Sequence, residues 1–178
     1  PWNATTLEWQ TPTTPPGHGN FAEELPVVHR WAYAYAVPGV VDDFVPQNMA
    51  PEEVKHTGDG IMASFNKTTD GVDAAIQMQR QTATYTEQNP NLPLHLKIGI
   101  NAGEPIAEDN DLFGSTVQMS ARIVDKAQAD EIFVSEVVRG ICAGKAYGFV
   151  NRGGFAMKGF DDDPILYEVV WNDQVAAE

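Results

Sequence analysis

The stretch 54–65, with the sequence VKHTGDGIMASF, constrains the fold more than any other part of the chain. Thr57 to Gly60 form a turn signal, because Gly takes a positive φ at no steric cost and Asp tolerates it. The apolar run 61–65 has the length of a strand, so we expect two short strands joined by this turn. Asp59 then stands between two glycines, with room for a bulky, cationic group to approach its carboxylate. The alternative is that Asp59 only makes the turn.

Size and charge limit the classes of protein to consider. The chain has 178 residues and a formal net charge of −14, which allows one ordinary domain, or a small domain with a tail. The charge argues against nucleic acid and anionic membrane surfaces as partners, but it leaves a nucleotide possible. No apolar run is long enough to span a membrane.

The expected location follows from cysteine usage and from the ends of the sequence. The single Cys142 rules out an internal disulfide framework and suits a reducing compartment. The chain starts at Pro1 rather than Met and has no signal-peptide pattern, so we expect a piece of a longer protein. We predict a cytoplasmic location, with attachment to a membrane protein in the longer parent as an alternative.

The chain divides into two unlike parts followed by a short tail. Residues 1–53 hold eight of the twelve prolines, which interrupt helices and central strands. We therefore predict an extended Pro- and Trp-rich tail over 1–52, a compact α+β domain over 53–171 and a C-terminal tail over 172–178. Within the first part, only 27–37 is free of proline and alternates like a strand.

The pattern of the second part predicts its elements. We expect a helix capped by Asp70 and ending near 88, a second helix over 115–126, and a short helix capped by Ser135. Residues 101–104 are expected to form a turn. The predicted strands are 94–100, 132–134, 149–150, 155–157 and 165–171.

Three polar residues of this part are candidates for chemistry. Gln118 and Arg122 lie at i and i+4 on the second predicted helix, so they share a face. Lys158 lies in a Met-Lys-Gly stretch just before an acidic loop. The alternatives are a solvated helix face and an ordinary surface lysine.

The first part resembles a known protein tail. Residues 1–9 read PWNATTLEW, and TPTTPP follows at 11–16 with Asn-Phe at 20–21. This sequence resembles the extramembrane C-terminal tail of cytochrome c oxidase subunit I, as far as about Pro51. The haem and copper ligands of that family lie elsewhere, so the resemblance implies no redox activity for this chain.

The second part contains five short motifs in a fixed order: EVKHTGDGIMASF at 53–65, IGINAGEPIA at 98–107, DLFG at 111–114, ARI at 121–123 and FAMKGF at 155–160. Together they resemble the class III adenylate/guanylate cyclase catalytic domain over about 53–171. The resemblance implies a ferredoxin-like βαββαβ core, incomplete here, that dimerises with active sites shared across the interface. It also implies a phosphorus–oxygen lyase of signal transduction, which converts ATP or GTP to the 3′,5′-cyclic nucleotide and pyrophosphate with two Mg²⁺ or Mn²⁺ ions.

The resemblance also implies roles for individual residues. Asp59 falls on one metal-binding aspartate. Lys55 and Asp111 fall on the pair that selects the purine, in the combination that prefers adenine, so ATP is the implied substrate. Arg122 falls on the arginine that stabilises the transition state and Lys158 on a lysine that contacts phosphate, which suits a transition state with charge spread over phosphate oxygens.

The sequence departs from the family in two places. The family's opening strand, which carries the other metal aspartate, is missing together with the two helices after it. We do not expect Asp42 and Asp43, which lie between prolines without a strand motif, to complete the site. Because the missing strand is central, we predict that 27–37 inserts in its place. Gln118 stands where the family usually has Asn.

Three functions follow as hypotheses. The first is an adenylate cyclase domain, working as a homodimer or heterodimer, which alone makes little or no cyclic AMP. The second is a non-catalytic cyclase-like module in a mixed dimer with an intact protomer. The third is the terminus of a cytochrome c oxidase subunit I fusion, arising naturally or from an error of sequence assembly.

Overall fold

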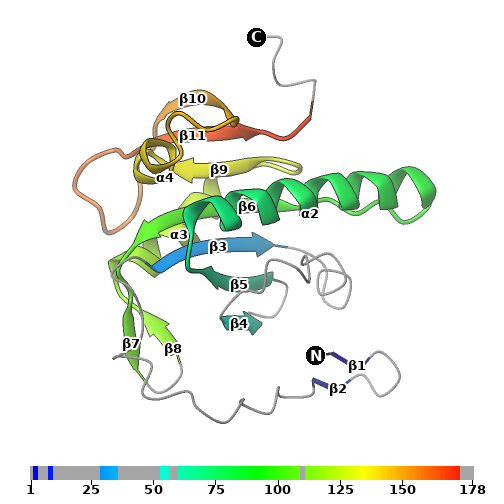
Figure 1. Cartoon of the computed structure of the whole chain (residues 1–178), viewed down its shortest axis with the longest axis horizontal. Coiled ribbons are helices and arrows are strands. Elements are labelled where there is room, and N and C mark those ends of the chain that lie inside the picture. Colours follow the sequence, from blue (N-terminus) through cyan, green and yellow to red (C-terminus); the bar gives the residue numbers. More distant parts are fainter. Residues whose placement is uncertain are drawn as a thin grey trace.

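The computed structural model describes the backbone of residues 2–3, 8–9, 29–35, 53–56, 60–108 and 111–172, and the side chains of 61–106 and 113–172. Within these residues the chain forms strands and helices in mixed order (Figure 1). The elements are β1 (Trp2–Asn3), β2 (Glu8–Trp9), β3 (His29–Tyr35), β4 (Glu53–His56), β5 (Gly60–Phe65), α2 (Thr68–Gln88), β6 (Lys97–Gly103), β7 (Ile106–Glu108), β8 (Asp111–Phe113), α3 (Ser115–Lys126), β9 (Ile132–Ser135), α4 (Glu136–Ile141), β10 (Gly148–Gly154) and β11 (Ile165–Val170).

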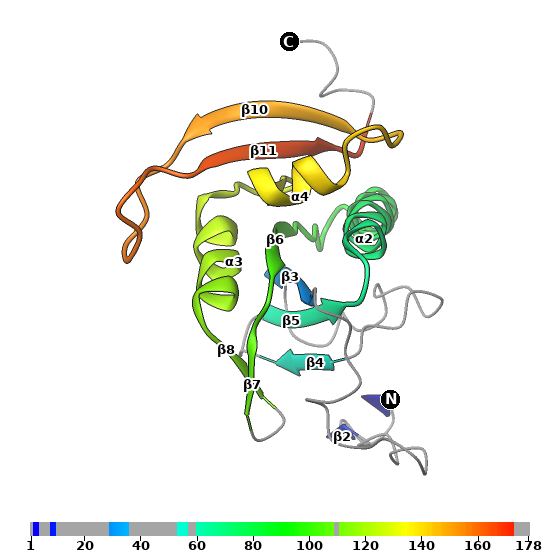
Figure 2. The same cartoon turned by 60° about the vertical axis from the view of Figure 1, so that its left-hand side comes forward.

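A seven-stranded sheet forms the centre of the fold, in the order β10-β11-β9-β6-β3-β5-β4. The β6–β9 pair is parallel, and the other pairs in this sheet are antiparallel. Helices α2 and α3 cover opposite faces of the sheet (Figures 1 and 2). This is an α+β core, as the sequence predicts.

Strand β3 confirms the predicted insertion of 27–37. It pairs with β5 on one side and β6 on the other, and among the described strands it alone joins β4 and β5 to the rest of the sheet. Its pairing satisfies backbone groups that would otherwise be left open in the middle of the sheet. One part of the predicted tail therefore belongs to the sheet, while the predicted domain limits stay a prediction.

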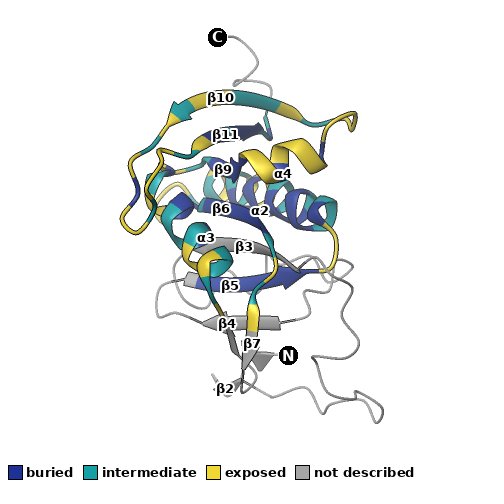
Figure 3. Cartoon of the chain, turned by 90° about the vertical axis from the view of Figure 1, so that its left-hand side faces the viewer, coloured by how far each residue is buried: buried dark blue, intermediate teal, exposed yellow. Residues whose placement is uncertain are grey.

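Successive residues of β6 face opposite sides of the sheet, so the core has two layers. Ile98 and Ile100 are fully buried and pack in one cluster with α2 residues such as Val72. Gly99, between them, lies against α3 on the other face, where a Cβ atom would stand 2.4 Å from the backbone nitrogen of Val124. Figure 3 shows β6 and β9 as buried strands of the sheet. The small residue lets the helix approach the sheet closely.

Several predicted elements are confirmed. Helix α3 has the predicted bounds, 115–126. The hydroxyl of Ser135 accepts a hydrogen bond from the backbone N–H of Val138 at 3.4 Å and so caps α4.

Other predicted elements are wrong. Asp70 does not cap α2, which begins at Thr68 after Lys67; the acidic side chain lies in the first turn, where it suits the helix dipole. Residues 101–103 continue β6 instead of turning, because they pair with 29–31 of β3. Residues 155–157 are not a strand, since β10 ends at Gly154 and the chain enters a loop.

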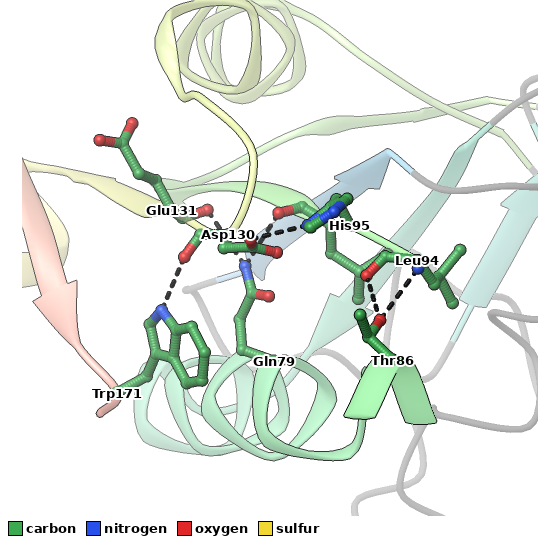
Figure 4. A network of polar contacts seen from close by, with 8 residues as sticks. Gln79, Thr86, Leu94, His95, Asp130, Glu131 and Trp171 are labelled. Atoms are coloured by element: carbon green, nitrogen blue, oxygen red, sulfur yellow. Dashed lines mark hydrogen bonds and ion pairs between the residues drawn. The ribbon is translucent and has the colours of Figure 1, made fainter. Parts of the chain in front are cut away.

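The segment 94–96, predicted as strand, is instead held by side chains of α2 (Figure 4). The hydroxyl of Thr86 donates to the carbonyl of Leu94 at 2.8 Å and accepts from its N–H at 2.9 Å. The buried amide of Gln79 donates to the carbonyl of Leu96 at 3.1 Å. These bonds replace the ladder bonds that a strand would make.

The turn before β9 is tied into the same network. The indole N–H of Trp171 donates to the carbonyl of Asp130 at 2.7 Å, and the carboxylate of Asp130 lies 2.8 Å from Nδ1 of His95 (Figure 4). Asp130 has φ 67°, a conformation that Asp tolerates better than most residues. The network joins α2, the residue that follows β11, and the loops before β6 and β9.

Tyr147 is expected to make stability depend on alkaline pH. Burial, and next the hydrogen bond that its hydroxyl donates to Asp73 at 2.8 Å, raise the pKa of Tyr147 above its ordinary value of 10.0. The fold therefore favours the neutral phenol: its contribution is complete below about pH 10 and is lost as the pH rises through the higher folded pKa. Denaturant titrations from pH 8 to 11 should show the free energy of unfolding falling above about pH 10.

The Tyr147→Phe variant provides the control. It cannot ionise at this position, so its stability should fall less steeply with pH over the same range. Equal slopes for the variant and the parent chain would contradict the assignment to Tyr147.

Candidate functional site

Helix α3 presents Gln118 and Arg122 outward. The helix buries Ser120, Ile123 and Val124 against the sheet, while Gln118 is exposed and Arg122 is half-buried. The spacing of four residues places the amide and the guanidinium on one face, as predicted. Nη1 of Arg122 lies 3.5 Å from the carboxylate of Asp125 one turn further on.

Lys158 projects from the loop between β10 and β11. The residue before it, Met157, is 6% exposed, whereas Lys158 itself is exposed. The backbone N–H of Phe160 donates to the carbonyl of Met157 at 3.2 Å, and Gly159 has φ 93°. A tight turn thus presents the lysine while its neighbour points into the core.

An apolar cluster joins α3 to this loop. Ile123 of α3 packs with Met157 of the loop and with Phe133 and Leu166 of the sheet, and Met119 packs against them. Ile123 is next to Arg122 in sequence, and Met119 is next to Gln118. The structure therefore brings together the helix that carries two of the predicted site residues and the loop that carries a third.

The structure describes only the backbone of two other predicted residues. Lys55 lies in β4, at the edge of the large sheet, opposite Met62 of β5. Asp111 begins β8 and pairs with Glu108 of β7 in a separate two-stranded sheet. Their predicted roles, like those of Gln118, Arg122 and Lys158, stay predictions.

The carboxylates within the described residues do not form a two-ion metal site. Asp59, with Asp42 and Asp43, lies outside the described residues. Within the described part, no group of three or more His, Cys, Asp or Glu could hold a metal ion. Strands β3, β5, β6 and β9 contain no Asp or Glu at all. Since Mg²⁺ takes oxygen ligands in a near-ideal octahedron, one aspartate is a poor basis for a pair of ions.

The hairpin of β7 and β8 carries two exposed apolar side chains that the sequence analysis missed. Ile106 and Phe113 face each other across the hairpin and are 62% and 48% exposed. The sequence does contain a signal for them: they stand at the two ends of a short hairpin, where the alternation of side chains along a strand places both on one face. Large apolar groups in such a pair suit contact with another protein surface.

Comparison with known proteins agrees with this architecture. The chain resembles solved nucleotide cyclases in fold: an adenylate/guanylate cyclase/hydrolase from Silicibacter pomeroyi has a TM-score of 0.71 at 22% identity, over 80% of this chain and 96% of that one. The adenylyl cyclase CyaB of P. aeruginosa has a TM-score of 0.65 at 18% identity, over 80% of this chain and 94% of that one. The chain thus shares the overall fold of these cyclases.

The family model for the adenylate and guanylate cyclase catalytic domain matches residues 39–170. The chain belongs to this family. A protein of Rhizobium meliloti, assigned by prediction as adenylate cyclase 3, is 29% identical over 109 residues, which make up 60% of this chain and 19% of that protein.

The oxidase resemblance also has a counterpart. The alternative cytochrome c oxidase subunit 1 of Bradyrhizobium diazoefficiens is 69% identical over 51 residues, 29% of this chain and 9% of that protein. The chain thus spans less than a fifth of the length of either curated relative. No helix in the described part of the chain has both the length and the apolar character that crossing a membrane requires.

Proposed function

We propose that this chain is an adenylate-type cyclase domain that binds ATP at an interface between two protomers. The reaction would convert ATP to 3′,5′-cyclic AMP and pyrophosphate. The observation that carries the proposal is the shared apolar cluster, which brings the helix of Gln118 and Arg122 next to the loop of Lys158. Family membership supplies the reaction class.

These residues suit the charge that the reaction develops. The ribose 3′-hydroxyl loses its proton to solvent and its oxygen attacks the α-phosphorus. The bond from the α-phosphorus to the oxygen that bridges it to the β-phosphorus breaks, and pyrophosphate leaves with that electron pair. Charge builds on phosphate oxygens, where the guanidinium of Arg122 and the ammonium of Lys158 would stabilise it. The Gln118 amide would add hydrogen-bond donors.

Base selection would fall to Lys55 and Asp111. Adenine offers an amino group as donor and ring nitrogens as acceptors. A carboxylate can accept from the amino group, and an ammonium can donate to a ring nitrogen. This pairing supports ATP over GTP as the substrate.

A shared interface suits the exposed surfaces of the chain. Gln118 and Arg122 face outward from α3 rather than into a closed cavity. Ile106 and Phe113 offer apolar surface on the β7–β8 hairpin, where a second protomer would bury them. A homodimer and a heterodimer with another cyclase domain both fit this arrangement.

A mixed dimer is the second candidate, and the composition of β3 favours it. The strand occupies a central place in the sheet yet offers no carboxylate for a metal ion. A partner protomer with a complete set of carboxylates would then be needed, while this chain contributes Lys55, Asp111, Arg122 and Lys158. In that arrangement the chain alone is a binding module.

The isolated chain is expected to make little or no cyclic AMP with Mg²⁺ or Mn²⁺. The partner in the test is a cyclase domain that keeps its full set of carboxylates but has lost its own lysine and arginine at the corresponding positions. Mixed with this partner, the chain should restore cyclic AMP formation. Arg122→Gln should then lower the restored rate by at least about a hundredfold, since a cation on the transferring phosphate is removed. Product is measured from ATP and, in parallel, from GTP.

Arg139→Gln is the matched control, because Arg139 lies on α4 over the ring of Tyr167 and outside the proposed site. It should leave the restored rate within about twofold. Robust turnover by the isolated chain would contradict the account of the metal site. No restoration with the partner would contradict the mixed dimer.

The oxidase fusion stays a third possibility, supported by the 51-residue relationship to an oxidase subunit. The place of 29–35 inside the sheet limits how this can be tested. Removing residues 1–51 would take away β3 and disturb the whole sheet, so a test of binding to oxidase subunits must keep that strand.

A further inference from the structure

The relative placement of the two proposed phosphate-binding cations depends on one apolar cluster. Arg122 and Lys158 are 36 positions apart in sequence, on a helix and on a loop. Each is the immediate neighbour of a cluster member: Ile123 is 0% exposed and Met157 is 6% exposed. The cluster therefore determines where both backbones lie.

Met157 is the buried residue of the loop in this cluster, and Phe155 and Phe160 on either side are half-buried against the same cluster. Its neighbours Ala156, Lys158 and Gly159 are exposed. The base of the loop is closed by the N–H of Phe155, which donates to the carbonyl of Pro164 at 3.1 Å. Between these points, the Met157 side chain is buried in the cluster that also contains Ile123 and Leu166.

We infer that Met157 is a positioning residue for Lys158: its burial in the cluster that contains Ile123 holds the lysine ammonium in place relative to the face of α3 that carries Arg122. The inference rests on the proposed function, because it assumes that Lys158 contacts phosphate. Truncation of Met157 would leave the lysine charge in place but would free the loop tip. When a triphosphate binds, the loop tip must then become ordered, and this lowers the binding free energy that is gained.

ATP binding to the full chain, measured by calorimetry with Mg²⁺ present, tests this with a double-mutant cycle. Lys158→Gln should weaken ATP binding about tenfold, the effect of losing one charge-assisted contact. Met157→Ala should weaken it about fivefold, through lost positioning. The double variant should bind no more weakly than Lys158→Gln alone, because the loop then has no cation to position.

Two further variants separate positioning from general loss of stability. Met157→Leu keeps the volume and should restore binding to within about twofold of the parent chain. Met78→Ala is the matched control: Met78 is also 6% exposed, but it lies on α2 and packs in the cluster on the other face of the sheet. It should lower the melting temperature as Met157→Ala does, without weakening ATP binding. If Met157→Ala fails to fold, Met157→Val replaces it in the same cycle.

The outcomes distinguish this inference from the function on which it rests. If Lys158→Gln and Arg122→Gln bind ATP like the parent chain, the proposed site is wrong and the inference fails with it. If Lys158→Gln weakens binding but Met157→Ala does not, or if the two effects multiply in the double variant, the positioning role alone is wrong. A Met78→Ala loss of binding equal to that of Met157→Ala would also overturn it.

Discussion

Replacing Gly99 by alanine is expected to lower the free energy of unfolding by at least about 3 kcal/mol. A Cβ atom there would lie 2.4 Å from the backbone nitrogen of Val124 and 2.9 Å from the carbonyl oxygen of Ser120. Both atoms belong to the backbone of α3, so no side-chain rotation can relieve the overlap. The helix must move away from β6, which also opens the cluster beside Arg122. Denaturant titration followed by circular dichroism measures the loss.

Gly140→Ala provides the matched control. Gly140 lies in α4, and a Cβ atom there would meet nothing within 4 Å. The substitution should be neutral or stabilise by about 0.5–1 kcal/mol, because alanine costs less backbone entropy in a helix. Similar stability for the two variants would show that α3 does not approach β6 as closely as described.

Replacing Ala32 by proline is expected to cost more than about 3 kcal/mol and to abolish cooperative unfolding of the sheet. Ala32 lies opposite Ala63 of β5 and Ile100 of β6, so its backbone is in the middle of two ladders. Proline removes a donor N–H and places its ring where a neighbouring strand must approach. Because β3 joins β4 and β5 to the other strands, the damage should reach both halves of the sheet.

Glu136→Pro is the control for this substitution. Glu136 is the first residue of α4, where proline is well tolerated, and Ser135 before it is already extended at φ −70° and ψ 160°. Its stability should change by less than about 1 kcal/mol. Hydrogen exchange offers an independent check, since fast exchange of all amides in 29–35 would contradict the central place of β3.

The local sequence pattern was enough to predict those elements whose conformation depends on residues close together in the chain. Helix α3 has its predicted bounds because its apolar residues recur at helical spacing and Gly114, at φ 105°, precedes it. The Ser135 cap of α4 is likewise a contact between residues three apart. The family followed from several short motifs in the right order, each readable without a structure.

Local pattern failed where a distant segment decides the outcome. Asn101 to Gly103 have turn-forming residues but extend β6, because β3 offers them partners. Residues 94–96 alternate like a strand, yet Gln79 and Thr86 of α2 take their backbone groups instead. The burial of Met157 could not be read from its neighbours, since both are exposed.

By itself, the sequence determined the family, the candidate residues Lys55, Asp59, Asp111, Gln118, Arg122 and Lys158, and the lack of carboxylates in the segment that replaces the first strand. The tertiary structure alone decided which segments become neighbours. It placed 29–35 between β5 and β6, and it buried Met157 and Ile123 in one cluster that a loop and a helix share. The physical reason is that strand pairing and apolar packing join residues far apart in the chain, whereas motifs record only the residues themselves.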